Sequence, residues 1–182
     1  ADASIRATAA ADAKQGMATI VSSLNLTVAG RAVFGGSSTD SPPLENAETI
    51  LDQLKSDLPP GLSAEQTVGF VQDWFQMPGG GFETSAYHGG HAPTTRIPVG
   101  PQETVAFSVT AADAAIRETL AAFATATLVY DGAFDQDPEG QAVLLTEAGE
   151  TMMSAESRIA ALRADVGAQQ SFLEDAKSRL TG

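Results

Sequence analysis

A strict heptad occupies forty residues near the end of the chain, Gln141 to Leu180, and constrains the fold more than any other feature. Apolar residues alternate spacings of three and four, interrupted by one glutamine, while charged residues fill the outer positions. A helix of this length measures about 60 Å, and its narrow apolar seam needs a second helix alongside. The seam consists of Leu145, Ala148, Met152, Ala155, Ile159, Leu162, Val166, Gln169, Leu173, Ala176 and Leu180.

The first 28 residues predict a matching helix. They are rich in alanine and contain no proline, and Met17, Ile20 and Leu24 continue the same spacing, with Gly16 as the weak point. No capping residue precedes the periodic run, and the final heptad reaches almost to the last residue. We therefore expect both helices to belong to a longer protein, in which they continue together as a pair.

Composition excludes several classes of function. The net charge of −13 repels phosphate backbones and anionic lipid surfaces, so we expect no nucleic acid partner. No apolar run approaches the roughly 20 residues that a membrane span needs, so we expect no membrane insertion. The chain has no cysteine, which excludes disulfides and thiol chemistry.

The middle of the chain predicts short elements. Glu45 to Leu58 has one apolar face, and prolines follow it. Ser63 and Gln66 form a capping box that opens a second short helix. The period then changes from 3.6 to 2, which predicts three short strands at Tyr87, Arg96–Val99 and Thr104–Val109.

A further helix over residues 111–130 is predicted to open with Thr110 and Asp113. The expected fold is mainly α: an elongated bundle of long, antiparallel, coiled-coil-like helices with a small α+β insert. Residues 1–44 and 110–182 form the helical rod, and residues 45–109 form the insert of two short helices and a three-stranded sheet.

Two loops could carry chemistry. His88 and His91 are the only histidines, and a shared metal would need further ligands, so an exposed loop is the better interpretation. Asp135 and Asp137 begin a segment that partly matches a calcium loop, but Thr146 stands where the loop needs a glutamate. We expect no catalytic residues, cofactor or metal. A metal- or ligand-binding helical module that uses either loop is the alternative from a different functional class.

A set of residues after the first helix resembles a known family. Leu24-Asn25, Gly30-Arg31 and Val33-Phe34-Gly35-Gly36 are followed by Thr39-Asp40 and Pro42-Pro43-Leu44, and residues 162–170 read LRADVGAQQ. Both stretches resemble bacterial flagellar hook–filament junction proteins, the FlgL type within the flagellin family. Ala32 departs from the family pattern, which usually has tyrosine there. The turn residues of the motif are Gly30, Arg31, Phe34, Gly35, Gly36, Thr39, Asp40 and Pro43.

The resemblance implies a structural, non-catalytic protein that joins the flagellar hook to the filament. It implies secretion through the flagellar export channel without a cleaved signal peptide, and an extracellular location in the organelle of motility. The implied partners are the second junction protein, flagellin and an export chaperone. Flagellin itself is the alternative within this class. We expect the present chain to be monomeric, since segments that would join subunits are missing from it.

Overall fold

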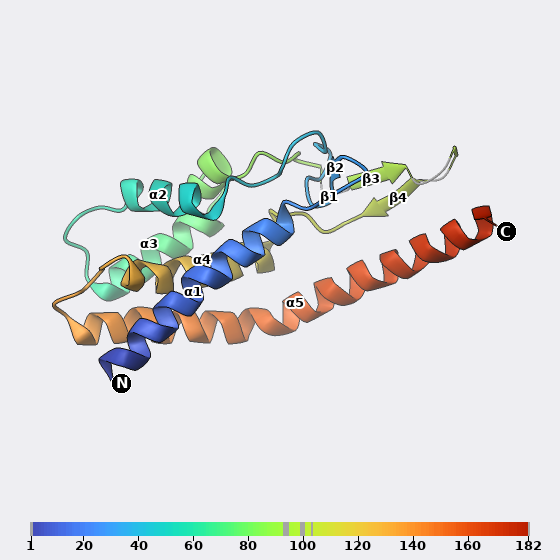
Figure 1. The fold of residues 1–182 in the computed structure, drawn as a ribbon. Helices are drawn as coiled ribbons and strands as arrows, with labels where there is room; N and C mark the ends of the chain where they lie inside the picture. Colours follow the sequence, from blue (N-terminus) through green and yellow to red (C-terminus); the bar gives the residue numbers. More distant parts are fainter. Residues whose placement is uncertain (1, 93–94, 99–100, 103, 182) are drawn as a thin grey trace.

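The computed structural model describes residues 2–92, 95–98, 101–102 and 104–181, with only the backbone described for residues 95–97, 105, 107, 165–166, 169–170 and 172–181. The fold is mainly α-helical, as predicted, and Figure 1 shows its arrangement. The elements are α1 (Ala3–Leu24), β1 (Thr27–Val28), β2 (Arg31–Ala32), α2 (Ala47–Asp57), α3 (Ala64–Gln76), η1 (Phe82–Ala86), β3 (Thr95–Pro98), β4 (Thr104–Phe107), α4 (Ala114–Tyr130) and α5 (Pro138–Thr181).

Helix α4 lies at the centre of the bundle. Its sequence is apolar on nearly every side, and 12 of its 17 residues are buried. A helix without a polar face has to be surrounded by protein, and α1, α3 and α5 all pack against α4. The expectation that the first and last helices form the main pair is wrong in this respect, because both pack chiefly on α4 and touch each other less.

Helices α1 and α5 run in the same direction, and each is antiparallel to α4. Near the start of both helices, Arg6 Nε donates to Gln141 Oε1 at 3.2 Å. Further along, Leu24 and Leu162 line the same groove. The chain ends therefore lie at opposite ends of the molecule, as Figure 1 shows. Helices α1 and α5 are parallel because the chain reverses direction between α1 and α4 and again between α4 and α5.

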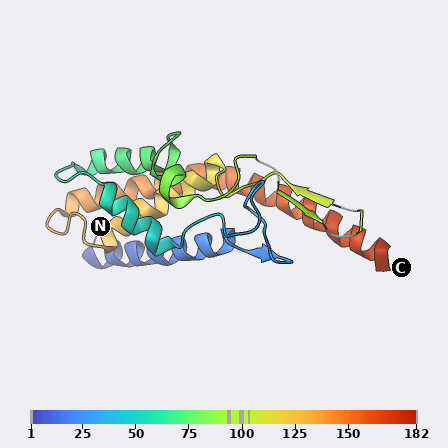
Figure 2. The same ribbon diagram turned by 90° about the horizontal axis from the view of Figure 1, so that it is seen from above.

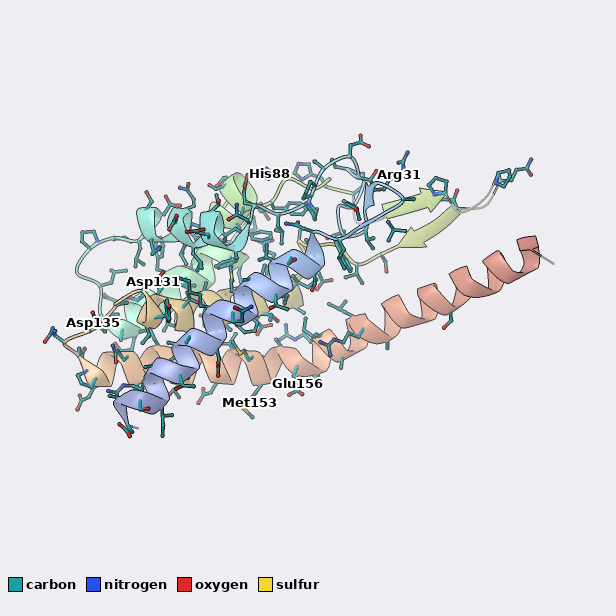
Figure 3. The ribbon with its side chains drawn as sticks, viewed as in Figure 1. Arg31, His88, Asp131, Asp135, Met153 and Glu156 are labelled. Atoms are coloured by element: carbon teal, nitrogen blue, oxygen red, sulfur yellow. The ribbon has the colours of Figure 1, made fainter. Side chains whose placement is uncertain are left out.

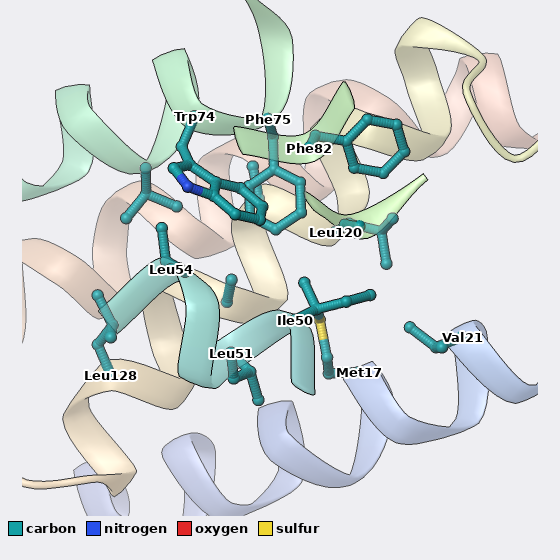
Figure 4. Close-up of a cluster of buried hydrophobic side chains, with 14 of the residues drawn as sticks. Met17, Val21, Ile50, Leu51, Leu54, Trp74, Phe75, Phe82, Leu120 and Leu128 are labelled. Atoms are coloured by element: carbon teal, nitrogen blue, oxygen red, sulfur yellow. The ribbon is translucent and has the colours of Figure 1, made fainter. Parts of the chain in front are cut away.

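Helices α2 and α3 belong to the main core. Ile50 and Leu54 of α2 and Phe75 of α3 are almost fully buried against Met17 of α1 and Leu120 of α4 (Figure 4). In Figure 2 α3 lies along the bundle and α2 crosses it obliquely. Residues 45–76 therefore do not form a separate insert at one end of a rod, because α2 and α3 pack against the long helices and share their core.

The first helix is shorter than predicted. It begins after Asp2, whose side chain accepts a hydrogen bond from Ser4 N at 3.3 Å, so a capping residue is present. It ends at Leu24 rather than Val28. A two-residue hairpin follows, in which Ala29 and Gly30 have φ values of 51° and 75°. A hairpin loop of this kind needs positive φ at both positions.

The predicted three-stranded sheet is also wrong. Among the described residues, β3 and β4 form a two-stranded antiparallel sheet, and Tyr87 instead makes an isolated bridge with Leu44. Val99, which we placed in a strand, lies outside the described residues. Residues 82–86 form the π-helix η1, which the sequence pattern did not predict. Helix α4 is capped by Asp113, whose side chain accepts from Ala115 N at 3.0 Å, rather than by Thr110.

Candidate functional site

The predicted seam of α5 divides at the point where this helix leaves the body. In its first half, Ala148 and Ala155 are buried, while Leu145 and Met152 are half-buried. The most buried residue is Leu144, which lies next to the seam because the helix contacts the body over a wider face than a two-helix seam provides.

Beyond Ala155 the seam is only partly covered. Ile159 and Leu162 are half-buried at the edge of the core. The later seam positions Val166, Leu173 and Leu180 fall where only the backbone is described, and this backbone remains helical to Thr181. In Figure 1 the distal half of α5 extends past the end of α1. We call residues 158–181 the α5 extension.

On α1, the predicted seam residues face the body. Met17 is fully buried, Leu24 is 6% exposed, and Ile20 packs against the core with more exposure. Helix α1 packs mainly on α4, with smaller contacts to α5 and α2, and Ile20 and Leu24 line the same groove as Leu162 of α5. The seam residues of α1 are therefore covered within the chain, whereas the heptad of α5 continues along the sequence past the end of α1.

An apolar groove marks the place where α5 diverges from the bundle. It has a volume of about 350 Å³. Its floor combines the end of α1, the start of α4 and the middle of α5, and Arg163 stands among its lining residues. The apolar residues that line it are Ile20, Leu24, Phe34, Val109, Ile116, Ile159 and Leu162.

The family-like motif is held together by Asn25. Its amide donates to Leu44 O at 2.9 Å, and its side-chain oxygen accepts from Leu44 N at 3.0 Å. An asparagine side chain that bonds both the backbone N–H and the backbone C=O of one residue fixes the position of that residue much as a neighbouring strand would. The two ends of the motif, Leu24-Asn25 and Pro43-Leu44, therefore lie side by side although 19 residues separate the bonded pair.

The turn residues between these ends have distinct roles. Arg31 Nη1 donates to Thr39 Oγ1 at 3.2 Å, and Phe34 O accepts from Ala111 N at 2.9 Å. Gly36 has a φ of 60°, and a Cβ there would lie 2.5 Å from Ala92 O. Gly35 O accepts a hydrogen bond from Gly90 N, and Pro43 O accepts one from His88 N. Gly30 lies in the hairpin loop, and Asp40 is exposed.

The histidine loop does not bring its two imidazoles to a shared ligand set. His88 Nε2 lies 2.8 Å from Glu45 Oε1, and both side chains are well exposed. His91 is exposed and lines a different recess with Glu83. Within the part of the chain that the structure describes, no group of three or more His, Asp or Glu residues could hold a metal ion.

The acidic loop before α5 has a structural use. Asp137 Oδ1 accepts from Gly140 N at 3.0 Å, and Asp137 O accepts from Gln141 N. A carboxylate at a helix start is favoured by the free N–H groups and the helix dipole. Asp135 is exposed. The calcium interpretation gains no support from this geometry.

Arg117 forms a buried polar cluster that the sequence analysis missed. Its side chain is 11% exposed, Nη1 donates to Glu83 Oε1 at 3.1 Å, and Nε donates to Phe75 O at the end of α3. The guanidinium also stacks over the Phe82 ring at 4.8 Å. The hydrogen bond from Gly79 N, more than Arg117, lowers the pKa of the Glu83 carboxyl. The one available signal was a basic residue in an otherwise largely apolar helix, where Glu118 is the only other charged residue.

None of these clusters has the arrangement of a catalytic site, so the α5 extension and its groove are the candidate functional surface. Among the described residues, no helix combines the length and the apolar character that crossing a bilayer requires. Comparison of the chain with protein-family models, with curated proteins and with solved structures gave no significant match.

Proposed function

We propose that this chain is a structural component of the bacterial flagellum, of the type that joins hook to filament. On this proposal it performs no catalysis and acts by helix pairing with neighbouring subunits. The proposal combines the resemblance of residues 24–44 and 162–170 to the junction family with the physical character of α5.

The observation that carries the proposal is that α5 is longer than the helices of the body on which it packs. The helix has 44 residues and extends past the end of α1 at the groove lined by Ile159 and Leu162 (Figure 1), although strand β4 also packs against it. The heptad continues through Val166, Leu173 and Leu180. A seam that extends past its own core favours a partner helix. Because α1 ends beside this groove, no helix among the described residues continues along the α5 extension, and we propose that a helix of another subunit does so.

The backbone contacts within the family-like motif also support the proposal. Asn25 and Leu44 make two hydrogen bonds to each other, and Gly36 occupies a position without space for a side chain. These contacts give a physical reason for the residues that carry the family resemblance. The motif turn also forms part of the groove through Phe34, so it lies next to the proposed pairing surface.

The proposed partners are the second junction protein, flagellin and an export chaperone, and the proposed location is outside the cell. Export through the flagellar channel requires a chain that refolds after passage. The absence of cysteine means that refolding depends on no disulfide formation. Local capping signals, such as the Ser63–Gln66 capping box, also favour helix formation without outside help.

Immunogold electron microscopy of isolated flagella tests the proposal. Antibodies against this chain should label a short zone between hook and filament. Labelling along the whole filament would instead identify the chain as flagellin. If purified flagella, prepared with intact hooks, carry no label and no peptide of this chain by mass spectrometry, the flagellar assignment is wrong.

A further inference from the structure

The α5 extension carries a charge pattern that constrains its partner. We propose that it pairs with an amphipathic helix whose seam is apolar and whose flanking positions are acidic. This inference rests on the proposed helix-pairing function and specifies the chemistry of the partner.

The heptad register, taken from the sequence, identifies the flanking positions. With Ile159 at position a and Leu162 at position d, the e and g positions are the ones beside the seam. In the α5 extension, four of these positions are basic and one is acidic. The basic residues are Arg158, Arg163, Lys177 and Arg179, and the acidic residue is Asp165.

This basic pattern is local. Residues 1–157 contain six basic and 20 acidic residues, a net charge of −14. Residues 158–182 contain four basic and three acidic residues, a net charge of +1. In the first half of α5 the e and g positions have no basic residue, since they are Ala142, Leu144, Gly149, Thr151 and Glu156. Positive flanks therefore begin where the helix leaves the body.

The body already contains one example of the proposed contact. Arg158 Nη1 lies 2.9 Å from Glu118 Oε2 on α4, so a flanking arginine of α5 pairs with an acid on the neighbouring helix. One turn further, Arg163 is exposed in the lining of the groove and has no ion pair with another described residue. A partner helix in the groove would supply the acid that α4 supplies to Arg158.

The same pattern disfavours a second copy of this chain as the occupant. In a parallel pair, g residues of one helix face e residues of the other, and Arg158 would face Arg163 of the second copy. In an antiparallel pair, e faces e and g faces g, and only the register that places Asp165 opposite Arg179 offsets the repulsion between Arg163 and Lys177. Like charges across a seam select against an incorrect partner.

Fluorescence anisotropy with two synthetic peptides tests the inference. Both peptides have about four heptads with the same apolar a and d residues, and carry either glutamate or lysine at every e and g position. The net charge of −13 would by itself attract the lysine peptide. We expect the opposite, with the glutamate peptide binding at least about tenfold more tightly at low salt.

Matched variants assign the binding to the groove. Arg163→Gln should weaken binding of the glutamate peptide about twofold to fivefold, whereas Gln136→Glu, which changes the net charge equally in a distant exposed loop, should not. Leu162→Ala should weaken binding about tenfold or more, whereas Met153→Ala, at a side chain 76% exposed on the same helix, should not. Circular dichroism melting verifies that each variant is folded.

The outcomes separate this inference from the proposed function. Equal binding of both peptides, or preference for the lysine peptide, overturns the acidic partner and leaves helix pairing intact. Failure of both peptides to bind the folded protein contradicts helix pairing at this surface as well. A stable dimer in sedimentation that is lost in Leu162→Ala would identify a second copy as the occupant and overturn the inference.

Discussion

At the residue scale, Asp131 connects three helices. Its carboxylate oxygens lie 3.2 Å from Lys14 Nζ of α1 and 3.0 Å from Lys55 Nζ of α2, and Asp131 itself ends α4 (Figure 3). Burial alone would raise the pKa of this carboxyl, but hydrogen bonds from Lys55 and Lys14 outweigh burial and lower the pKa below its ordinary value. The side chain is 18% exposed, so solvent screens these contacts only in part.

We predict that Asp131→Asn lowers the free energy of unfolding by about 1 kcal/mol at pH 7. A depressed pKa stabilises the folded state above the unfolded pKa of about 4, and this contribution is lost as the pH falls through the folded pKa. The difference between wild type and variant should therefore shrink in acid, as measured by urea unfolding. Asp135→Asn in the adjacent loop is the matched control and should have little effect. A difference that grows below pH 4 would contradict this account.

The structure explains why a glycine, Gly16, stands inside the first helix, where glycine lowers helix propensity. A Cβ at this helical position would lie 2.4 Å from the ring of Phe123, so glycine permits the close approach of α1 and α4. We predict that Gly16→Ala destabilises the protein by about 1–3 kcal/mol through overpacking. Gly149→Ala on α5, where a Cβ meets nothing within 4 Å, should stabilise it by up to about 1 kcal/mol. Thermal unfolding of both variants tests the pair, and equal effects of the two would show that the α1–α4 contact is looser than described.

At the element scale, α5 has two parts with different surroundings. Leu144 is fully buried beneath the bundle, whereas Leu162 lies half-buried in the open groove. The cost of removing a side chain increases with the cavity that it leaves. A leucine at the edge of an open groove leaves a smaller cavity than one in the core.

Leu144→Ala should therefore cost about 2–5 kcal/mol of stability, and Leu162→Ala about 1 kcal/mol. Chemical denaturation of the isolated chain gives both values. If Leu162→Ala were the more destabilising of the two, the groove would be part of the core and its role as a pairing surface would fail.

The sequence predicted elements better than their arrangement. The Ser63–Gln66 capping box and the start of α2 near residue 45 are local signals, and the structure contains both elements. The hairpin after Leu24 escaped prediction because Thr27 continues the three-and-four spacing of the first helix, and the positive φ at Ala29 has no signal in its residue type. The parallel orientation of α1 and α5 depends on tertiary contacts with α4. Arg117 was missed because its partners, Phe75 and Glu83, are distant in sequence.

At the scale of the whole molecule, acidic charge and an incompletely covered helix occur together. The body carries the large negative charge, which opposes self-association, and the α5 extension carries a small positive charge. We predict that the chain is monomeric at micromolar concentration, as measured by sedimentation velocity. A stable closed oligomer would contradict this prediction and would mean that copies of the chain cover the extension themselves.

The central claim is that the α5 extension pairs with another helix in the assembled flagellum. Because the chain has no cysteine, Arg163→Cys introduces a unique attachment point for a photo-crosslinker beside the groove, and Gln136→Cys provides a matched control in a distant exposed loop. The account predicts that irradiation of isolated flagella joins position 163 to a helical segment of a flagellar partner, and that position 136 gives no such product. Incorporation of both variants into flagella without a cross-link at position 163 would contradict the claim.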